Sequence, residues 1–258
     1  MHTVLASSAH NPSRRRLLGA SLGLGAGLAL VDVLGARARG AYAQDASSDA
    51  PAAWPVIDVG LDAGHSRVDV GASGGGVGEY QHTLDLAQRI KPLLEQAGLT
   101  VALSRTDHEP LTAMSLRDPD ARTELEQAAR IAAVGNARIY VSIHFNGGPP
   151  ALRGTETYYN SEHAGPDSRR LAEALQQSVV AELRAYGYET ADRGAKEDLL
   201  AGKPYGHFFS LRGSMPSALV EGLFLSNPLE AGLLLREDAR QALARGYAGG
   251  IVAYFAGG

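Results

Sequence analysis

Short apolar segments alternate with longer amphipathic segments along most of the chain, and this alternation constrains the fold more than any other feature of the sequence. The compact apolar runs typical of strands are Val56–Leu61, Leu99–Ser104, Arg138–His144, Gly154–Tyr159 and Ala218–Phe224, with a shorter run at Phe208–Leu211. Apolar residues recur near helical spacing in Tyr80–Ala97, Glu124–Val134, Arg169–Tyr186 and Glu237–Phe255. The alternation predicts a single α/β domain with a twisted, mostly parallel β-sheet and helices on both faces.

Cysteine is absent from the 258 residues. This absence excludes disulfides, thiolate metal sites, cysteine nucleophiles and a lipoprotein anchor. A catalytic metal in this chain must therefore be bound by histidine, aspartate or glutamate.

The first 43 residues have the features of an export signal. A basic segment beginning at Ser13 contains Arg14 and Arg15, a glycine-rich apolar run follows, and Ala41-Tyr42-Ala43 forms an A-x-A cleavage site. The paired arginines resemble a twin-arginine signal. The alternatives are an ordinary secretory signal and an uncleaved anchor. We expect residues 44–53 to be a linker, residues 54–258 to be the functional domain, and the protein to be exported to the periplasm, the cell wall or the extracellular space.

The charge of the chain changes when the signal is removed. Of 24 basic and 28 acidic residues, residues 1–43 contain five arginines and one aspartate. The remainder has 19 basic and 27 acidic residues, a formal net charge of −8. An acidic domain repels a phosphate backbone, which argues against nucleic acid as a partner.

Four residues are candidates for chemistry. His65 and His144 each follow or end a predicted strand, and the carboxyl ends of parallel strands meet at one edge of a sheet, where sites of open α/β sheets lie. Glu79 opens a helix, where an acid also stabilises the helix dipole. Glu221 lies within an apolar strand, where an ionised carboxylate is costly unless it is paired or bound to a metal.

The sequence resembles the zinc-dependent N-acetylmuramoyl-L-alanine amidases, the bacterial cell-wall amidases. The segments that carry the resemblance stand in the family's order and cover nearly all of residues 56–254. They are Leu61-Asp62-Ala63-Gly64-His65, Asp69-Val70-Gly71-Ala72 with Glu79, Ser104-Arg105-Thr106-Asp107, Arg130 through Asn136, Val141-Ser142-Ile143-His144-Phe145-Asn146, Gly154-Thr155-Glu156-Thr157-Tyr158-Tyr159, Asp192-Arg193-Gly194-Ala195-Lys196, and Pro216-Ser217-Ala218-Leu219-Val220-Glu221 followed by Phe224-Leu225-Ser226-Asn227.

The resemblance implies that residues 54–258 are a catalytic domain that binds one Zn²⁺ per chain through His65, Glu79 and His144, with Glu221 as the catalytic acid and base. It implies hydrolysis, by zinc-activated water, of the amide between N-acetylmuramic acid and L-alanine of the stem peptide. Zinc in hydrolases takes three nitrogen or oxygen ligands and keeps a fourth position open, which fits this set. The resemblance implies peptidoglycan as the partner, together with a protein activator where one exists. After cleavage of the export signal, the mature protein would not be stably inserted in a membrane. The alternatives are a zinc peptidase and a non-catalytic wall-binding regulator.

Departures from the family pattern concern the groove and not the proposed ligands. Ser66 and Arg67 replace two glycines, Tyr80 replaces a lysine, and residues 114–129 are extra chain relative to a typical member. Gly222-Leu223 also stands where the family usually has the order Ile-Gly.

Other polar residues have weaker signals. We expect Ser142 and Asn146 to satisfy backbone groups, and His82, His108 and His163 to lie at the surface. Glu156 is either an acceptor that braces a ligand or a charge on a strand face. Arg193 and Lys196 are candidates to contact the carboxylates of the stem peptide.

Overall fold

The computed structural model describes residues 56–113, 118–202, 206 and 208–257. The predicted export signal and linker therefore lie outside the described residues. Residues 55–258 group into one compact unit. No helix within the described ranges combines the length and apolar character needed to span a membrane.

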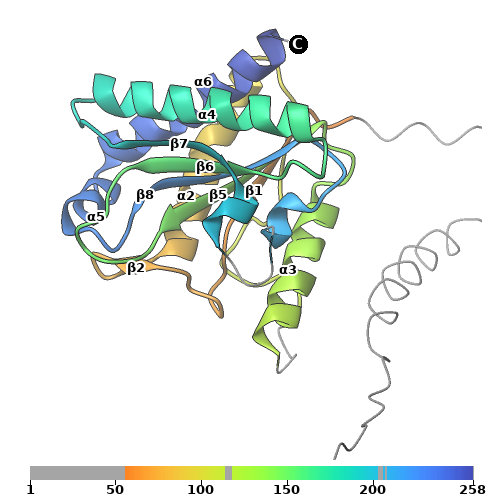
Figure 1. Ribbon diagram of the computed structural model, residues 1–258, viewed down its shortest axis with the longest axis horizontal. Helices are drawn as coiled ribbons and strands as arrows, with labels where there is room; N and C mark the ends of the chain where they lie inside the picture. Colours follow the sequence, from red (N-terminus) through yellow and green to blue (C-terminus); the bar gives the residue numbers. More distant parts are fainter. Residues whose placement is uncertain (1–55, 114–117, 203–205, 207, 258) are drawn as a thin grey trace, which may run out of the picture. The chain divides into compact units, whose positions relative to one another are not determined.

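A six-stranded sheet forms the centre of the domain, with the strand order β4-β1-β5-β8-β6-β7 (Figure 1). Its strands are β1 (Val59–Ala63), β4 (Val101–Leu103), β5 (Ile139–Asn146), β6 (Thr155–Tyr159), β7 (Asp192–Glu197) and β8 (Ser217–Phe224). Strands β4, β1, β5 and β8 are parallel to one another, and β6 pairs with β8 in the antiparallel sense. A small hairpin of β2 (Ser73–Gly74) and β3 (Val77–Gly78) precedes the first described helix. The predicted α/β fold with a mostly parallel sheet is confirmed.

Helices cover both faces of the sheet, as predicted (Figure 1). They are α2 (Glu79–Gln96), α3 (Pro119–Ala133), α4 (Gly165–Ala185), α5 (Pro228–Leu234) and α6 (Glu237–Ala256), with the short 3-10 helices η1 (Asp198–Ala201) and η2 (Phe209–Leu211). Apolar residues of α2, α4 and α6 share the main core with one face of the sheet. The residues just after α3 pack with Tyr140 of β5 in a second cluster. The opposite face of the sheet is thus covered by α3 and η2.

Strand β5 shows how the two faces differ. Ile139, Val141 and Ile143 belong to the main core, whereas Tyr140 belongs to the cluster beside α3. Successive side chains in a strand point to opposite faces. His144 therefore shares the α3 side of the sheet with Tyr140, and this side holds the site described below.

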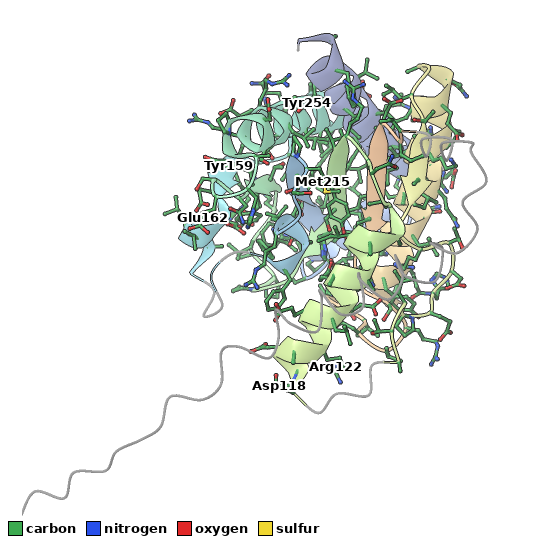
Figure 2. All side chains as sticks on the ribbon, turned by 90° about the vertical axis from the view of Figure 1, so that its right-hand side faces the viewer. Asp118, Arg122, Tyr159, Glu162, Met215 and Tyr254 are labelled. Atoms are coloured by element: carbon green, nitrogen blue, oxygen red, sulfur yellow. The ribbon has the colours of Figure 1, made fainter. Side chains whose placement is uncertain are left out.

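Helix α3 begins at Pro119, five residues before the helix start predicted at Glu124. The Asp118 carboxylate accepts hydrogen bonds from the backbone N–H groups of Asp120 and Ala121, and proline occupies the first turn, where its missing N–H costs nothing. Much of the chain expected to be extra, residues 114–129, thus forms the first 11 of the 15 residues of α3; residues 114–117 lie outside the described ranges. Figure 2 shows Asp118 and Arg122 on the end of α3 that projects from the rest of the domain.

Candidate metal centre and active-site cleft

His65 stands two residues after β1, in a left-handed backbone conformation with φ of 62°. Its Nδ1 lies 3.0 Å from Asp69 Oδ2, and its Nε2 lies 3.3 Å from Glu79 Oε2. Burial lowers the pKa of His65, but the hydrogen bonds with Asp69 and Glu79 outweigh burial and raise it to about 10. The two carboxylates therefore attract positive charge to this position, whether that charge is a proton on the ring or a metal ion bound by it.

Glu79 is the first residue of α2 and is buried. Its Oε1 accepts a hydrogen bond of 2.9 Å from the backbone N–H of Phe145, and its Oε2 accepts one of 2.8 Å from that of Ala72. Burial opposes ionisation of Glu79, but hydrogen bonds from His144 and His65 hold its pKa well below the ordinary value. Glu79 is thus a fixed, buried anion at the start of a helix, where the dipole also favours negative charge.

His144 and Glu221 lie side by side on neighbouring strands. They are direct register partners between the parallel strands β5 and β8, which places both side chains on the same face of the sheet. His144 Nδ1 lies 3.0 Å from Glu79 Oε1. His65, Glu79, His144 and Glu221 all line one cleft of about 410 Å³. The structure therefore brings together all four residues that the sequence singles out.

The residues present fit a metal ion. Each of His65, Glu79 and His144 offers one ligand atom, and these atoms lie within 4.8 Å of one another. Among the described residues, the buried Nε2 of His144 has no hydrogen-bond partner. Two imidazoles and one carboxylate are a donor set that binds zinc in hydrolases.

Two glycines leave room for this cluster. A Cβ added at Gly64 would lie 2.4 Å from His144 Cε1, inside van der Waals contact. Gly71 has a φ of +66°, and a Cβ there would lie 2.3 Å from Glu79 Oε2. Gly64 and Gly71 are therefore explained by the close approach of His144 and Glu79, which leaves no room for a side chain at either position.

A buried polar network supports the loop that carries His65. Asp62 is fully buried and accepts hydrogen bonds of 2.7 Å from both Ser104 and Ser142, with Arg130 3.3 Å away. Burial raises the pKa of Asp62, but Arg130 and the two serines outweigh burial and lower it. Arg130 also donates to the backbone carbonyls of Ala63 and His65. Paired in this way, the buried charges hold the end of β1 in place.

The rest of the cleft comes from segments in which the sequence singled out no residue for chemistry, although one of them, residues 114–129, was expected to affect the groove. Thr123 and Gln127 of α3 line it, together with Phe208, Phe209 and Ser210 at η2. Sequence reasoning also missed the contact of Asp69 with His65, although Asp69 stands in one of the segments that carry the resemblance. The spacing of four residues within a loop gives no periodic signal for such a contact.

The expectations for Ser142, Asn146 and His82 are wrong. Ser142 and Asn146 bind carboxylates, those of Asp62 and Glu156, and not backbone groups. His82 is buried beside Phe145, because α2 is packed between the sheet and α6, whereas His108 is exposed as expected. Glu156 contacts Asn146 and two cations, and no hydrogen bond links it to the three proposed ligands within the described part of the chain.

The fold and the cleft together define the class of the protein as an α/β domain with a candidate metal centre in a cleft. Residues 59–253 match the family described as N-acetylmuramoyl-L-alanine amidase. The chain belongs to this amidase family.

Known relatives agree with this assignment. The uncharacterized protein YqiI of Bacillus subtilis is 34% identical over 196 residues, which cover 76% of this chain and 83% of that protein. The N-acetylmuramoyl-L-alanine amidase LytC of the same organism is 31% identical over 197 residues, which cover 76% of this chain but only 35% of LytC. The CwlD amidase of Clostridioides difficile, solved in complex with the GerS lipoprotein, has a TM-score of 0.67 at 25% identity, covering 78% of this chain and all of that one.

Proposed function

We propose that this amidase hydrolyses the bond between N-acetylmuramic acid and L-alanine with one zinc ion held by His65, Glu79 and His144. The observation that supports the proposal most is the convergence of these three side chains with Glu221 in one cleft, in a chain of the amidase family. When bound there, zinc would supply the Lewis acidity that polarises the scissile carbonyl and acidifies a water molecule.

The protein's own residues then handle orientation and proton transfer. Asp69 fixes the ring of His65 through Nδ1, which leaves Nε2 directed toward the centre of the cluster. Glu221, one strand away from His144, is placed to accept a proton from the attacking water and to deliver it to the departing amine of L-alanine. Phe208 and Phe209 make part of the cleft lining apolar, which limits water around the reacting groups.

The products of digestion test this function. Wild-type protein incubated with purified sacculi is expected to release stem peptides with a new L-alanine amino terminus and to leave the glycan strands uncut. Mass spectrometry of the soluble products identifies both features. Peptides cut only beyond L-alanine, with L-alanine still attached to muramic acid, would instead indicate a peptidase, and new reducing ends would indicate a glycosidase.

We also propose export of this protein through the twin-arginine route, because Arg14 and Arg15 precede an apolar run and an A-x-A site at Ala43. Replacing both arginines with lysine is expected to remove most of the mature protein from the exported fraction while the precursor accumulates in the cell. Immunoblotting of the fractions measures this, with an Arg37→Lys, Arg39→Lys variant as the matched control. Undiminished export of the Arg14 and Arg15 variant would contradict the twin-arginine route.

A further inference from the structure

A row of charged side chains crosses the α3 side of the sheet, starting at the candidate metal centre. His144 on β5 is the register partner of Glu221 on β8, and Glu221 is the register partner of Glu156 on β6. Strand β7, next to β6, contributes Arg193 and Lys196, whose side chains reach back to Glu156. The row thus runs from a proposed ligand, through the proposed base and a buried carboxylate, to two cations.

Glu156 holds the two cations in place. Its Oε2 accepts hydrogen bonds of 2.8 Å from Arg193 Nε and 2.6 Å from Lys196 Nζ, and its Oε1 accepts one of 2.7 Å from Asn146 Nδ2. Burial raises the pKa of Glu156, but these three donors outweigh burial and lower it to about 2. Glu156 is therefore an anion under all physiological conditions, and with the two cations the cluster carries a net charge of +1.

Both cations keep hydrogen-bonding capacity for a further anion. Each side chain is about one third exposed, at 33%. Arg193 uses only Nε toward Glu156, so the two terminal nitrogens of its guanidinium group have no hydrogen-bond partner among the described residues. The guanidinium carbon lies 5.2 Å from the centre of the Phe224 ring, a cation–π contact that helps to hold the group in place. A fixed planar fork of two N–H donors matches the geometry of a carboxylate.

The position of the cluster limits which carboxylate it can reach. Neighbouring strands lie about 4.8 Å apart. Arg193 lies on β7, two strands away from Glu221 on β8, and its side chain extends over β6 toward Glu156. The guanidinium group of Arg193 therefore lies about one to two strand spacings from Glu221. An extended peptide advances about 3.5 Å per residue. The separation corresponds to about 1.4 to 2.7 residues, so a peptide whose scissile bond lies at Glu221 would bring its second or third residue to Arg193.

Resting on the proposed function, we propose that Arg193, together with Lys196, binds the free α-carboxylate of the acidic residue that follows L-alanine in the stem peptide. The cluster then selects peptidoglycan in which this carboxylate is free over peptidoglycan in which it is amidated. Amidation removes the negative charge and replaces one acceptor oxygen with a donor that faces the donors of Arg193, so the amidated peptide loses the bidentate contact.

The test uses a pair of synthetic disaccharide-pentapeptides that differ only in this α-carboxylate, free or amidated. Wild type is expected to cleave the free form with a kcat/KM about 10 to 100 times higher, the range that a hydrogen-bonded charge pair provides. Arg193→Gln is expected to lower kcat/KM by a similar factor on the free form only, so that the preference disappears. Arg193→Lys should restore part of it, because the charge remains and the fork is lost.

Arg169→Gln on α4 is the matched control, because Arg169 is 63% exposed and its ion pair within the described residues is with Glu173 on the same helix. It should retain the wild-type preference. Equal losses on both substrates in Arg193→Gln would show a structural role for Arg193 and overturn the proposal, as would a wild type without preference. If wild type cleaves neither compound, the proposed function fails. The preference is then tested separately, by calorimetric measurement of the binding of the two pentapeptides. Equal affinities for the free and the amidated pentapeptide would overturn the proposed selectivity.

Discussion

His144→Ala is expected to lose stoichiometric zinc and, with it, nearly all hydrolytic activity. The side chain is buried, lies 3.0 Å from Glu79 Oε1 and supplies one of the three candidate ligands found among the described residues. Replacing a residue that hydrogen-bonds to a metal ligand typically lowers metal affinity about 10- to 100-fold. Loss of a ligand itself should exceed this, because only His65 and Glu79 would remain, and zinc sites in hydrolases use three protein ligands.

Zinc per chain, measured by elemental analysis after dialysis of the purified protein, checks this expectation. Wild type should retain one zinc and His144→Ala much less than one. His163→Ala, a histidine outside the cleft, is the matched control and should bind zinc like wild type. Circular dichroism separates loss of metal from loss of fold. One zinc per chain in a folded His144→Ala protein would remove His144 from the proposed ligand set.

The sequence predicts that the candidate metal-site residues lie close together, because they stand in or just after its clearest strands. His65 follows β1 and His144 lies near the end of β5, and the two strands are parallel neighbours, so their carboxyl ends must meet. Glu221 is conspicuous as an acid in an otherwise apolar strand. Each of these positions follows from the two-residue period of a strand and the direction in which parallel strands run.

The rest of the cleft depends on contacts that leave no periodic pattern. Strand β7 has the sequence Asp-Arg-Gly-Ala-Lys-Glu, and as a polar strand at the sheet edge it lacks the apolar run by which strands are found. The wall at Phe208 and Phe209 depends on how η2 packs beside α3, over a long separation in sequence. The antiparallel direction of β6 is likewise set by tertiary packing. The start of α3 at Pro119, by contrast, could have been predicted from the sequence, because the capping residue Asp118 and the following Pro119 are local signals for a helix start.

Replacing Glu221 is expected to have a second large effect on activity, through proton transfer and not through metal binding. Glu221 lies in β8 beside His144 and lines the cleft, while neighbouring residues of its strand, Val220 and Gly222, are buried. A carboxylate on the cleft side of a rigid central strand is held at a fixed distance from the reacting groups. Glutamine has nearly the same shape but cannot accept and return a proton at neutral pH.

Glu221→Gln is therefore expected to lower kcat about 10²- to 10⁴-fold, the range of general acid–base catalysis, while zinc content and folding remain those of wild type. Turnover of sacculi, zinc analysis and circular dichroism on the same preparation measure the three properties. Glu173→Gln, half-exposed on α4, is the matched control and should keep full activity. This pattern differs from that of His144→Ala, where zinc and activity are lost together. Near-normal turnover by Glu221→Gln would show that another group transfers the proton, whereas loss of zinc in this variant would move Glu221 from proton transfer to metal binding.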